Sequence, residues 1–244
     1  MVLAAGLGTR LQPLTDDRPK ALVELGGRTL LELTLARLRS FGIHDVIVNT
    51  HHFGDKIAGY LRANDNFGMH IEVSREEILL DTGGGLKNAA HFLSEGRDLD
   101  EPFLLHNVDV LSNIDFGSML EEHRRRGALA TLAMQDRATS RPLLFDENSL
   151  LCGRRLGANG ADEIVRQSDK KLPLAFAGIH VISTRIFPLM NEGDAFSIIP
   201  TYLRLAREGE SIAAFRADKY YWRDLGRPQQ IADAVQDIES GRYS

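Results

Sequence analysis

The sequence predicts an α/β protein with a Rossmann-like, three-layer arrangement around a mixed, mostly parallel sheet. Three observations lead to this fold class. Short apolar runs alternate with amphipathic segments over the first half of the chain, glycines directly follow the first apolar run, and polar residues stand where later apolar runs end. Alternation of strand and helix patterns is typical of parallel sheets covered by helices.

The first half divides into regular elements. We expect helices in which apolar side chains recur at helical spacing; in the first, Leu31, Leu35 and Leu38 share one stripe that can pack against a sheet. The expected strands are residues 2–5, 45–49, 70–73, 102–106 and 128–134, and the expected helices are residues 30–41, 55–63, 86–93 and 118–126.

The pattern changes at Arg137. Two short strands are expected around the turn at residues 146–148, followed by a polar, glycine-rich stretch, so residues 137–172 are interpreted as an insertion on the substrate side of the sheet. Regular patterning then returns, and we expect one domain over residues 1–244. The later elements are strands at 174–182 and 212–215, a helix near 198–207, and a helix at 228–239 that starts on Pro228.

Composition narrows the possible classes of partner. The chain has 244 residues, 43% of them hydrophobic, and a net charge of −5, so no general basic field exists to attract nucleic acid. The single cysteine, Cys152, cannot form an internal disulfide. Neither an export signal nor a run of about 18 apolar residues occurs. We expect a cytoplasmic protein, monomer or dimer, without nucleic-acid or membrane partners.

The loop after the first strand combines glycines with cations. Gly6 and Gly8 allow a sharp turn and a close approach of backbone N–H groups, and Arg10 and Lys20 add positive charge. Spacing alone leaves a plain turn and a phosphate clamp about equally favoured. Leu11 stands where a dinucleotide fingerprint needs its third glycine, and no Walker sequence occurs, which disfavours NAD enzymes and P-loop NTPases.

The stretch LAAGLGTRLQPLTDDRPKALVEL closely resembles the signature of the sugar-1-phosphate nucleotidylyltransferases, G-x-G-T-R-x-x-P-x-T-x-x-x-P-K. The resemblance implies the nucleotide-diphospho-sugar transferase fold. It also implies catalytic roles for Arg10, which would orient the triphosphate, and Lys20, which would contact the α-phosphate and the sugar phosphate. The nucleotide would lie against Leu3, Ala4, Ala5, Gly6, Gly8 and Thr9.

A second glycine-rich stretch, LLDTGGGLKNA, places Gly83, Gly84 and Gly85 just before an expected helix. Alone, it is more often a plain helix start. Its position after the third strand matches the base-binding loop of the same family, which implies nucleotide binding by these glycines. The TGGG form looks most like N-acetylmuramate-1-phosphate uridylyltransferases and mannose- or heptose-1-phosphate guanylyltransferases.

Two aspartates are candidate ligands for Mg²⁺. Asp109 follows the strand in FLLHNVD, at the carboxyl end where α/β sheets bind ligands, and carboxylate oxygens suit Mg²⁺. The family usually has N-G-D here, and Val108 replaces the glycine. Asp224 in YYWRDLGRP matches the family's second magnesium ligand, so the pairing of the two aspartates is implied by the resemblance alone. His106 is expected to be a structural histidine and Asp115 a helix N-cap.

Sugar contacts have the least specific signals. Asn107 belongs to the same strand end as Asp109, Gly178 lies in a strand that resembles the family's sugar-pocket strand, and Glu163 and Asn159 lie in the polar insertion. Core packing explains Gly178 nearly as well. Trp222 and Tyr221 are expected to pack rather than stack on substrate.

The resemblance implies a Mg²⁺-dependent enzyme that condenses a nucleoside triphosphate with a sugar 1-phosphate and releases pyrophosphate. UTP with a muramate-type amino-sugar phosphate is favoured, followed by guanylyl transfer to mannose or heptose phosphate and then cytidylyl transfer to phosphocholine. A non-catalytic nucleotide-sugar-binding regulatory protein is an alternative of another class. A glycosyltransferase is disfavoured because Asn107, two residues before Asp109, breaks the usual D-x-D pair.

Overall fold

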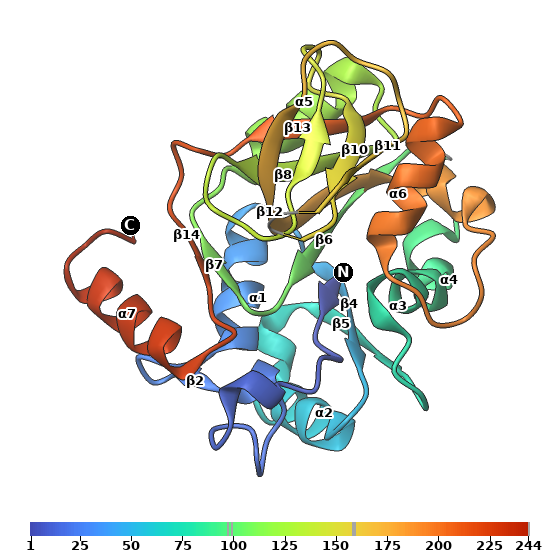
Figure 1. Ribbon diagram of the computed structural model, residues 1–244. Coiled ribbons are helices and arrows are strands. Elements are labelled where there is room, and N and C mark those ends of the chain that lie inside the picture. The colour runs from blue at the N-terminus through green and yellow to red at the C-terminus, as the bar shows by residue number, and fades with distance from the viewer. Residues whose placement is uncertain (97, 99, 158–159, 244) are drawn as a thin grey trace.

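A mixed sheet forms the centre of the fold (Figure 1). The computed structural model describes residues 1–244 except 97, 99, 158–159 and 244. Within these described residues the sheet has ten strands, with the order β11-β10-β9-β12-β6-β1-β4-β5 and with β8 and β13 attached through β12. Its strands are β1 Val2–Leu3, β4 Asp45–Thr50, β5 His70–Arg75, β6 Pro102–Asn107, β8 Ala130–Gln135, β9 Leu143–Phe145, β10 Leu151–Arg155, β11 Asp162–Ile164, β12 Leu172–Ser183 and β13 Ile212–Arg216.

The central strands are mostly parallel. Four neighbouring strands pair in parallel, in the order β5, β4, β1 and β6. β12 is antiparallel to both β6 and β8, so β8 runs in the same direction as β6, and β13 pairs in parallel with β8. The carboxyl ends of β1, β4 and β6 therefore meet at one edge of the sheet, where ligands of open α/β sheets bind. The predicted fold class is confirmed.

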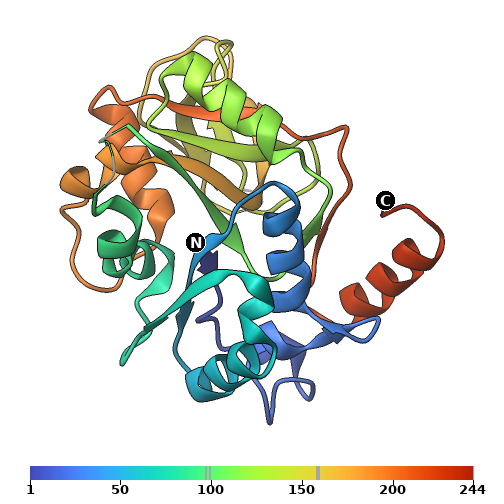
Figure 2. The same ribbon diagram turned by 180° about the vertical axis from the view of Figure 1, so that it is seen from behind.

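Helices cover both faces of the sheet. Successive residues of β4 point to opposite faces: Val46 and Val48 pack in one apolar cluster, and Ile47 packs in the other. The first cluster contains residues from helices α1 Leu30–Ser40, α2 Gly54–Ala63, α5 Phe116–Arg126 and α7 Pro228–Glu239; α1, α2 and α5 are seen from behind in Figure 2. The second contains residues from α3 Asp81–Asn88, α4 Ala90–Ser94 and α6 Ile198–Arg207.

Two predicted features of the helices are confirmed. The stripe of Leu31, Leu35 and Leu38 is fully buried in the first cluster. Asp115 caps α5, since its side chain accepts a hydrogen bond from the backbone N–H of Ser118 at 3.0 Å. Within the part of the chain that is described, no helix is both long and apolar enough to cross a membrane.

The predicted insertion extends the sheet. β9 and β10 form the expected hairpin, and Asp146 stabilises its turn by accepting hydrogen bonds from the backbone N–H groups of Asn148 and Leu150. The sequence pattern missed β11, which pairs with β10. The amino-terminal end of β12 pairs with β9, so this hairpin continues the central sheet. Asn159 lies outside the described residues.

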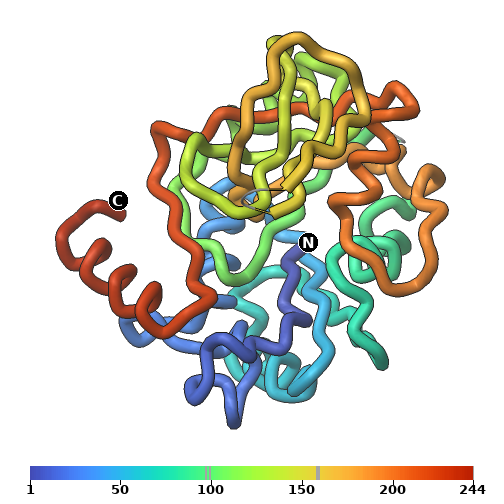
Figure 3. The backbone as a smooth tube through the Cα atoms, viewed as in Figure 1, coloured from blue at the N-terminus to red at the C-terminus, as the bar shows by residue number. Residues whose placement is uncertain are grey.

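Two small sheets and several 3₁₀ helices complete the fold. β2 Glu24–Leu25 pairs with β3 Arg28–Thr29, and β7 Val110–Ser112 pairs with β14 Trp222–Asp224. Figure 3 traces the C-terminal segment back along β7 before it turns into α7. The 3₁₀ helices are Thr9–Leu11, Lys20–Leu22, Asp65–Gly68 and Thr184–Leu189.

Some predicted boundaries were wrong. The first strand ends at Leu3 and not at residue 5, because the backbone N–H of Ala4 donates to the Asn49 side chain instead of to a neighbouring strand. The helix expected at 86–93 begins at Asp81 and is divided at Ala89 into α3 and α4.

Candidate active site

Two cavities open at the carboxyl ends of the central strands, and Asn107 at the end of β6 lines both. The first cavity measures 580 Å³ and is bordered by the chain after β1, by Lys20 and by Asp109. The second cavity measures 720 Å³ and is bordered by Arg10, Gly178 and Asp224. A ligand in one cavity can therefore lie close to a ligand in the other.

Lys20 and Asp109 face each other in the first cavity. They form an ion pair, and their side chains are only 12% and 16% exposed. Leu3, Ala4, Ala5 and Gly6, all predicted to lie against the nucleotide, line the same cavity. A Cβ at Gly6 would meet no atom within 4 Å, so the absence of a side chain there leaves open space beside the backbone.

Gly8 shapes the loop that positions Lys20. It adopts φ +68°, a left-handed conformation that glycine tolerates, and a Cβ there would lie 2.9 Å from Thr15 and 3.2 Å from Lys20. Thr15 in turn donates a hydrogen bond to the Gly8 carbonyl at 2.9 Å. Gly8 is therefore required for the path of the chain. Thr9 lines a different, smaller cavity beside Leu7 and Gln12.

Asn49, on β4, lines the first cavity and is hydrogen-bonded to residues on either side of it. Its side-chain oxygen accepts from the Ala4 N–H at 2.8 Å, and its amide donates to Glu76 at 2.7 Å. Glu76, only 6% exposed, also accepts from the Leu80 N–H at 3.1 Å. These bonds link the loop after β1 to the loop before α3, and both loops border the cavity.

The three glycines of the second glycine-rich stretch do not form a loop. Gly83, Gly84 and Gly85 lie inside α3 and are buried. A Cβ would lie 2.3 Å from Phe196 at Gly83, 2.1 Å from the Asp194 carbonyl oxygen at Gly84, and 2.7 Å from Asn49 and Glu76 at Gly85. The expected loop was wrong: close packing explains the glycines. Instead, Leu79, Asp81 and Thr82 line the first cavity.

Arg10 and Asp224 are neighbours in the second cavity. The Asp224 Oδ1 atom accepts from the Gly226 N–H at 3.0 Å. A Cβ at Gly226 would lie 2.8 Å from that Asp224 oxygen and 2.9 Å from an Arg10 nitrogen. Glycine at this position therefore lets both side chains approach the same point.

Pairing of β7 with β14 brings the two predicted metal ligands together. Asp224 is opposite Val110, the residue after Asp109, and the Leu225 N–H donates to the Asp109 carbonyl at 2.8 Å. Asp109 lines the first cavity and Asp224 the second. Asp109 directly precedes β7 and Asp224 ends β14, so the backbones of the two aspartates lie side by side between the two cavities.

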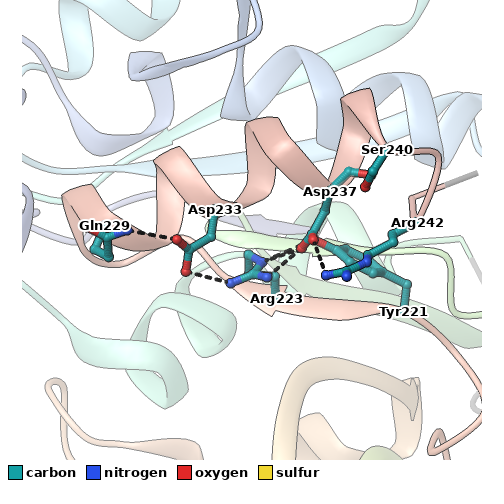
Figure 4. A network of polar contacts seen from close by, with 7 residues as sticks. All are labelled: Tyr221, Arg223, Gln229, Asp233, Asp237, Ser240 and Arg242. Atoms are coloured by element: carbon teal, nitrogen blue, oxygen red, sulfur yellow. Dashed lines mark hydrogen bonds and ion pairs between the residues drawn. The ribbon is translucent and has the colours of Figure 1, made fainter.

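A polar network holds β14 against α7 (Figure 4). Asp237, 3% exposed, accepts hydrogen bonds from the Tyr221 hydroxyl at 2.8 Å and from Arg223 Nε at 2.9 Å. Arg223 also pairs with Asp233 at 3.1 Å. Hydrogen bonds from Tyr221 and Arg223 hold the pKa of Asp237 below its ordinary value. The network fixes the residue next to Asp224, and Tyr221 is structural as expected.

A bulge in β12 organises another wall of the second cavity. Gly178 adopts φ +76° where the pairing of β12 with β8 shifts register, and a Cβ there would lie 3.0 Å from the Asn107 side chain. The Phe176 carbonyl accepts from Arg137 at 2.8 Å, and the Ala177 carbonyl accepts from the Trp222 ring N–H at 2.7 Å. Besides packing, Trp222 lines the cavity.

The remaining predicted residues lie as follows. His106 is buried and hydrogen-bonds the Asn107 carbonyl at 2.8 Å; burial lowers the pKa of His106 to about 4, which makes it a neutral structural residue, as expected. Val108 is buried and lines the first cavity. Glu163 pairs with Arg154 at 2.7 Å, and Arg154 rather than Glu163 lines the second cavity.

Sequence patterns missed several lining residues. Asn49 is a polar residue near the end of an apolar strand, as Asn107 is at the end of β6, so its position was a usable signal. Arg137 and Arg141 follow the strand β8 in a segment without a motif, and the fold brings them to the second cavity. Burial lowers the pKa of the Arg137 guanidinium, an effect that the Asp224 carboxylate opposes.

The fold and the paired cationic and acidic side chains define a protein of the nucleotide-binding α/β transferase class. Residues 1–142 match the nucleotidyl transferase family, and the chain belongs to this family.

Two curated relatives match nearly the whole chain. An N-acetylmuramate alpha-1-phosphate uridylyltransferase of Caulobacter vibrioides is 35% identical over 243 residues, covering 94% of this chain and 92% of that protein. A mannose-1-phosphate guanylyltransferase of Mycobacterium tuberculosis is 27% identical over 99% of this chain, which spans 64% of that protein's length. Homologues of the chain are therefore sugar-1-phosphate nucleotidyltransferases that differ in nucleotide and sugar.

A solved structure supports the fold. The crystal structure of HddC from Yersinia pseudotuberculosis complexed with GMP-PN superposes with a TM-score of 0.75, covers 97% of each chain and is 21% identical. At this identity the likeness concerns the fold.

Proposed function

We propose that the protein transfers a nucleotidyl group from a nucleoside triphosphate to a sugar 1-phosphate and releases pyrophosphate. One observation carries the proposal: two cavities share Asn107, and each has a cation beside an aspartate, Lys20 with Asp109 and Arg10 with Asp224. Such an arrangement can hold two phosphorylated substrates side by side. The sugar phosphate oxygen then attacks the α-phosphorus, and the bond to the pyrophosphate breaks.

The charged residues have distinct roles in this proposal. The nucleotide lies along Leu3–Gly6, and the sugar lies against Asn107 and Gly178. Lys20 neutralises charge on the α-phosphate and on the incoming phosphate, and Arg10 neutralises charge on the phosphates from the second cavity. No protein nucleophile is required, because positioning and charge neutralisation suffice for phosphoryl-type transfer.

Asp109 and Asp224 fit a Mg²⁺ ion by their chemistry. Mg²⁺ is commonly held by one or two carboxylates together with substrate phosphates and waters, and the pairing of β7 with β14 brings the backbones of these two aspartates side by side. The ion would supply charge neutralisation between the phosphates. Asp109 pairs with Lys20, so the Lys20 ammonium stands beside the place where Asp109 would hold the ion.

We propose UTP and a muramate-type amino-sugar 1-phosphate as substrates. The support is the uridylyltransferase relative, which matches along 92% of its own length. Guanylyl transfer to mannose or heptose phosphate is the second candidate, supported by the mannose-1-phosphate guanylyltransferase that matches 99% of this chain. We further propose that residues 1–244 act as one nucleotidyltransferase domain with 137–172 on the substrate side, and the pairing of β9 with β12 supports this.

A pyrophosphate-release panel tests the proposal. UTP, GTP, CTP, dTTP and ATP are crossed with several sugar 1-phosphates, with and without Mg²⁺. Lys20→Met and Asp109→Asn are each expected to lower turnover about a hundredfold or more, as removal of one transition-state contact does. Lys219→Met, a matched change at an exposed lysine on the Tyr220 ring, is expected to leave turnover unchanged.

Two results would refute the assignment. Normal turnover of Lys20→Met would remove the proposed role of the cation. Absence of pyrophosphate release with every pair, together with tight binding of a finished nucleotide sugar, would instead identify the regulatory alternative.

A further inference from the structure

The second cavity carries more positive charge than one sugar phosphate requires. Among the described residues that line it, Arg10, Arg137, Arg141, Arg154 and Arg155 are cationic, and Asp224 is acidic. The chain as a whole has a net charge of −5, so this concentration of arginine is local. Neutral sugar hydroxyls do not require it.

Some of this charge is already neutralised. Arg154 pairs with Glu163 at 2.7 Å, and Arg155 pairs with Asp162 at 2.8 Å. Arg10 lies beside Asp224, where the proposed function uses it for phosphate. Arg137 and Arg141 remain. Within the described part of the chain, neither forms an ion pair.

Arg137 is fixed in place with unused donors. Its Nη2 donates to the Phe176 carbonyl at 2.8 Å, and its guanidinium lies 3.9 Å from the centre of the Trp222 ring. Its Nε is buried and has no acceptor among the described residues. Trp222 is itself fixed by its hydrogen bond to the Ala177 carbonyl. The guanidinium is therefore preorganised beside Gly178, at the wall predicted to face the sugar.

Arg141 stands on the same side of the cavity. It precedes Pro142, whose carbonyl accepts from the Arg155 N–H at 3.0 Å, and this bond ties the segment after β8 to the end of β10. Its side chain is exposed and lines the cavity, and it forms no hydrogen bond or ion pair with the described residues. It is thus a cation available to a ligand.

We infer that Arg137 and Arg141 form a subsite for a carboxylate on the sugar, so that the protein selects an acidic sugar 1-phosphate over its neutral counterpart. The inference rests on the proposed function. A guanidinium presents a planar fork of N–H donors that matches a carboxylate, and bonds of this kind are stronger than those to hydroxyls. Arg137 supplies the fixed part of the subsite, and Arg141 supplies the part that closes on the ligand.

Two sugar phosphates that differ in one acidic group test the inference. N-acetylmuramic acid 1-phosphate carries a lactyl carboxylate that N-acetylglucosamine 1-phosphate lacks, and the methyl ester of the former keeps the bulk without the charge. We expect the protein to prefer the acid to both neutral compounds in kcat/KM by about ten- to a hundredfold, the range of a charge-assisted hydrogen bond.

The variants separate this subsite from the rest of the cavity. Arg141→Gln is expected to reduce the preference about tenfold, mainly through KM, and the double change with Arg137→Gln is expected to abolish it. Arg137→Lys, which keeps the charge and loses the fork, should fall between the wild type and Arg137→Gln. Arg155→Gln is the matched control, because its guanidinium already pairs with Asp162, and it should leave the ratio unchanged.

Binding measured without turnover distinguishes failure of the inference from failure of the proposed function. Each sugar phosphate is titrated calorimetrically into the protein with Mg²⁺ and an α,β-methylene analogue of UTP or GTP. Equal binding of acid and neutral sugars, binding of neither, or a preference retained by the double variant would overturn the carboxylate subsite. Lack of pyrophosphate release alongside preferential binding of the acid would overturn the transfer reaction only.

Discussion

Replacing Gly85 by alanine is expected to destabilise the protein, although alanine is the better helix former. Gly85 lies inside α3, where alanine alone would stabilise the helix by about 1 kcal/mol. The new Cβ, however, would lie 2.7 Å from both the Asn49 amide nitrogen and the Glu76 carboxyl oxygen. These two atoms are hydrogen-bonded to each other at 2.7 Å and are buried, so the methyl group must separate them.

The magnitude follows from three contributions. Forcing an extra carbon into a packed interior costs about 1 to 3 kcal/mol. Weakening a buried hydrogen bond whose partners have no access to water costs about 1 to 3 kcal/mol. After the helix gain of about 1 kcal/mol, the net loss is about 1 to 5 kcal/mol in the free energy of unfolding. At about 2 to 4 °C per kcal/mol for a chain of this length, that corresponds to a fall in Tm of roughly 2 to 20 °C.

Gly59→Ala is the matched control. Gly59 lies inside α2, and a Cβ there would meet no atom within 4 Å, so the same substitution should raise stability by about 0.4 to 1 kcal/mol. Urea and thermal unfolding of both variants measure the difference. Because Asn49 also holds the Ala4 N–H beside the first cavity, Gly85→Ala should raise the KM for nucleotide. A Gly85→Ala protein as stable as Gly59→Ala would refute this account of the packing.

Two further predictions concern pH. Burial lowers the pKa of His180 to about 3, so this histidine stays neutral in the folded protein, whereas in the unfolded chain it protonates below about pH 6.5. The free energy of unfolding should therefore fall as the pH is lowered. His180→Gln should reduce the slope of the free energy of unfolding against pH by about 1.4 kcal/mol per pH unit between pH 6 and 4, as measured by urea titrations. An unchanged slope would contradict this assignment. Hydrogen bonds from Tyr221 and Arg223 hold the pKa of Asp237 below its ordinary value of 3.8. The ionised Asp237 therefore stabilises the folded protein above that pH, and this contribution is lost as the pH falls further. Asp237→Asn should lower Tm at pH 7, with a smaller difference from wild type near pH 3. A difference in Tm that stays constant across this range would exclude an ionic origin.

Local sequence patterns predicted most of the fold because most helices and strands show, in their own residues, the spacing of apolar side chains that is typical of that element. The alternation of Val46, Ile47 and Val48 between the two apolar clusters is visible in the sequence, and so is the leucine stripe of α1. The glycines of α3 misled the prediction because three consecutive glycines are typical of loops. What stabilises them in a helix is contact with Phe196 and Asp194, residues distant in sequence, so no local pattern could have indicated it.

The candidate site was predictable in parts. The motif from Gly6 to Lys20 carries enough fixed positions to be identified, and Asp109 closely follows a strand at the ligand edge of the sheet. Arg137 and Arg141 had no such signal, because what brings Arg137 to the second cavity is the bulge of β12 at Gly178 and the carbonyl of Phe176. A register shift depends on how two strands pair, so the sequence of one segment does not indicate it.

The C-terminal helix α7 stabilises the position of Asp224 in the site. Asp224 meets Asp109 through β7 and β14, which pair over three residues each, and so short a two-stranded pairing is marginal by itself. Asp237 on α7 binds Arg223, the residue before Asp224, and also Tyr221, and Gln230 of the same helix lines the second cavity. Because Ile231 and Ala234 anchor α7 in the first apolar cluster, the position of the Asp224 carboxylate depends on the core around α1 and α2. The register of two short strands therefore depends on the packing of the first apolar cluster.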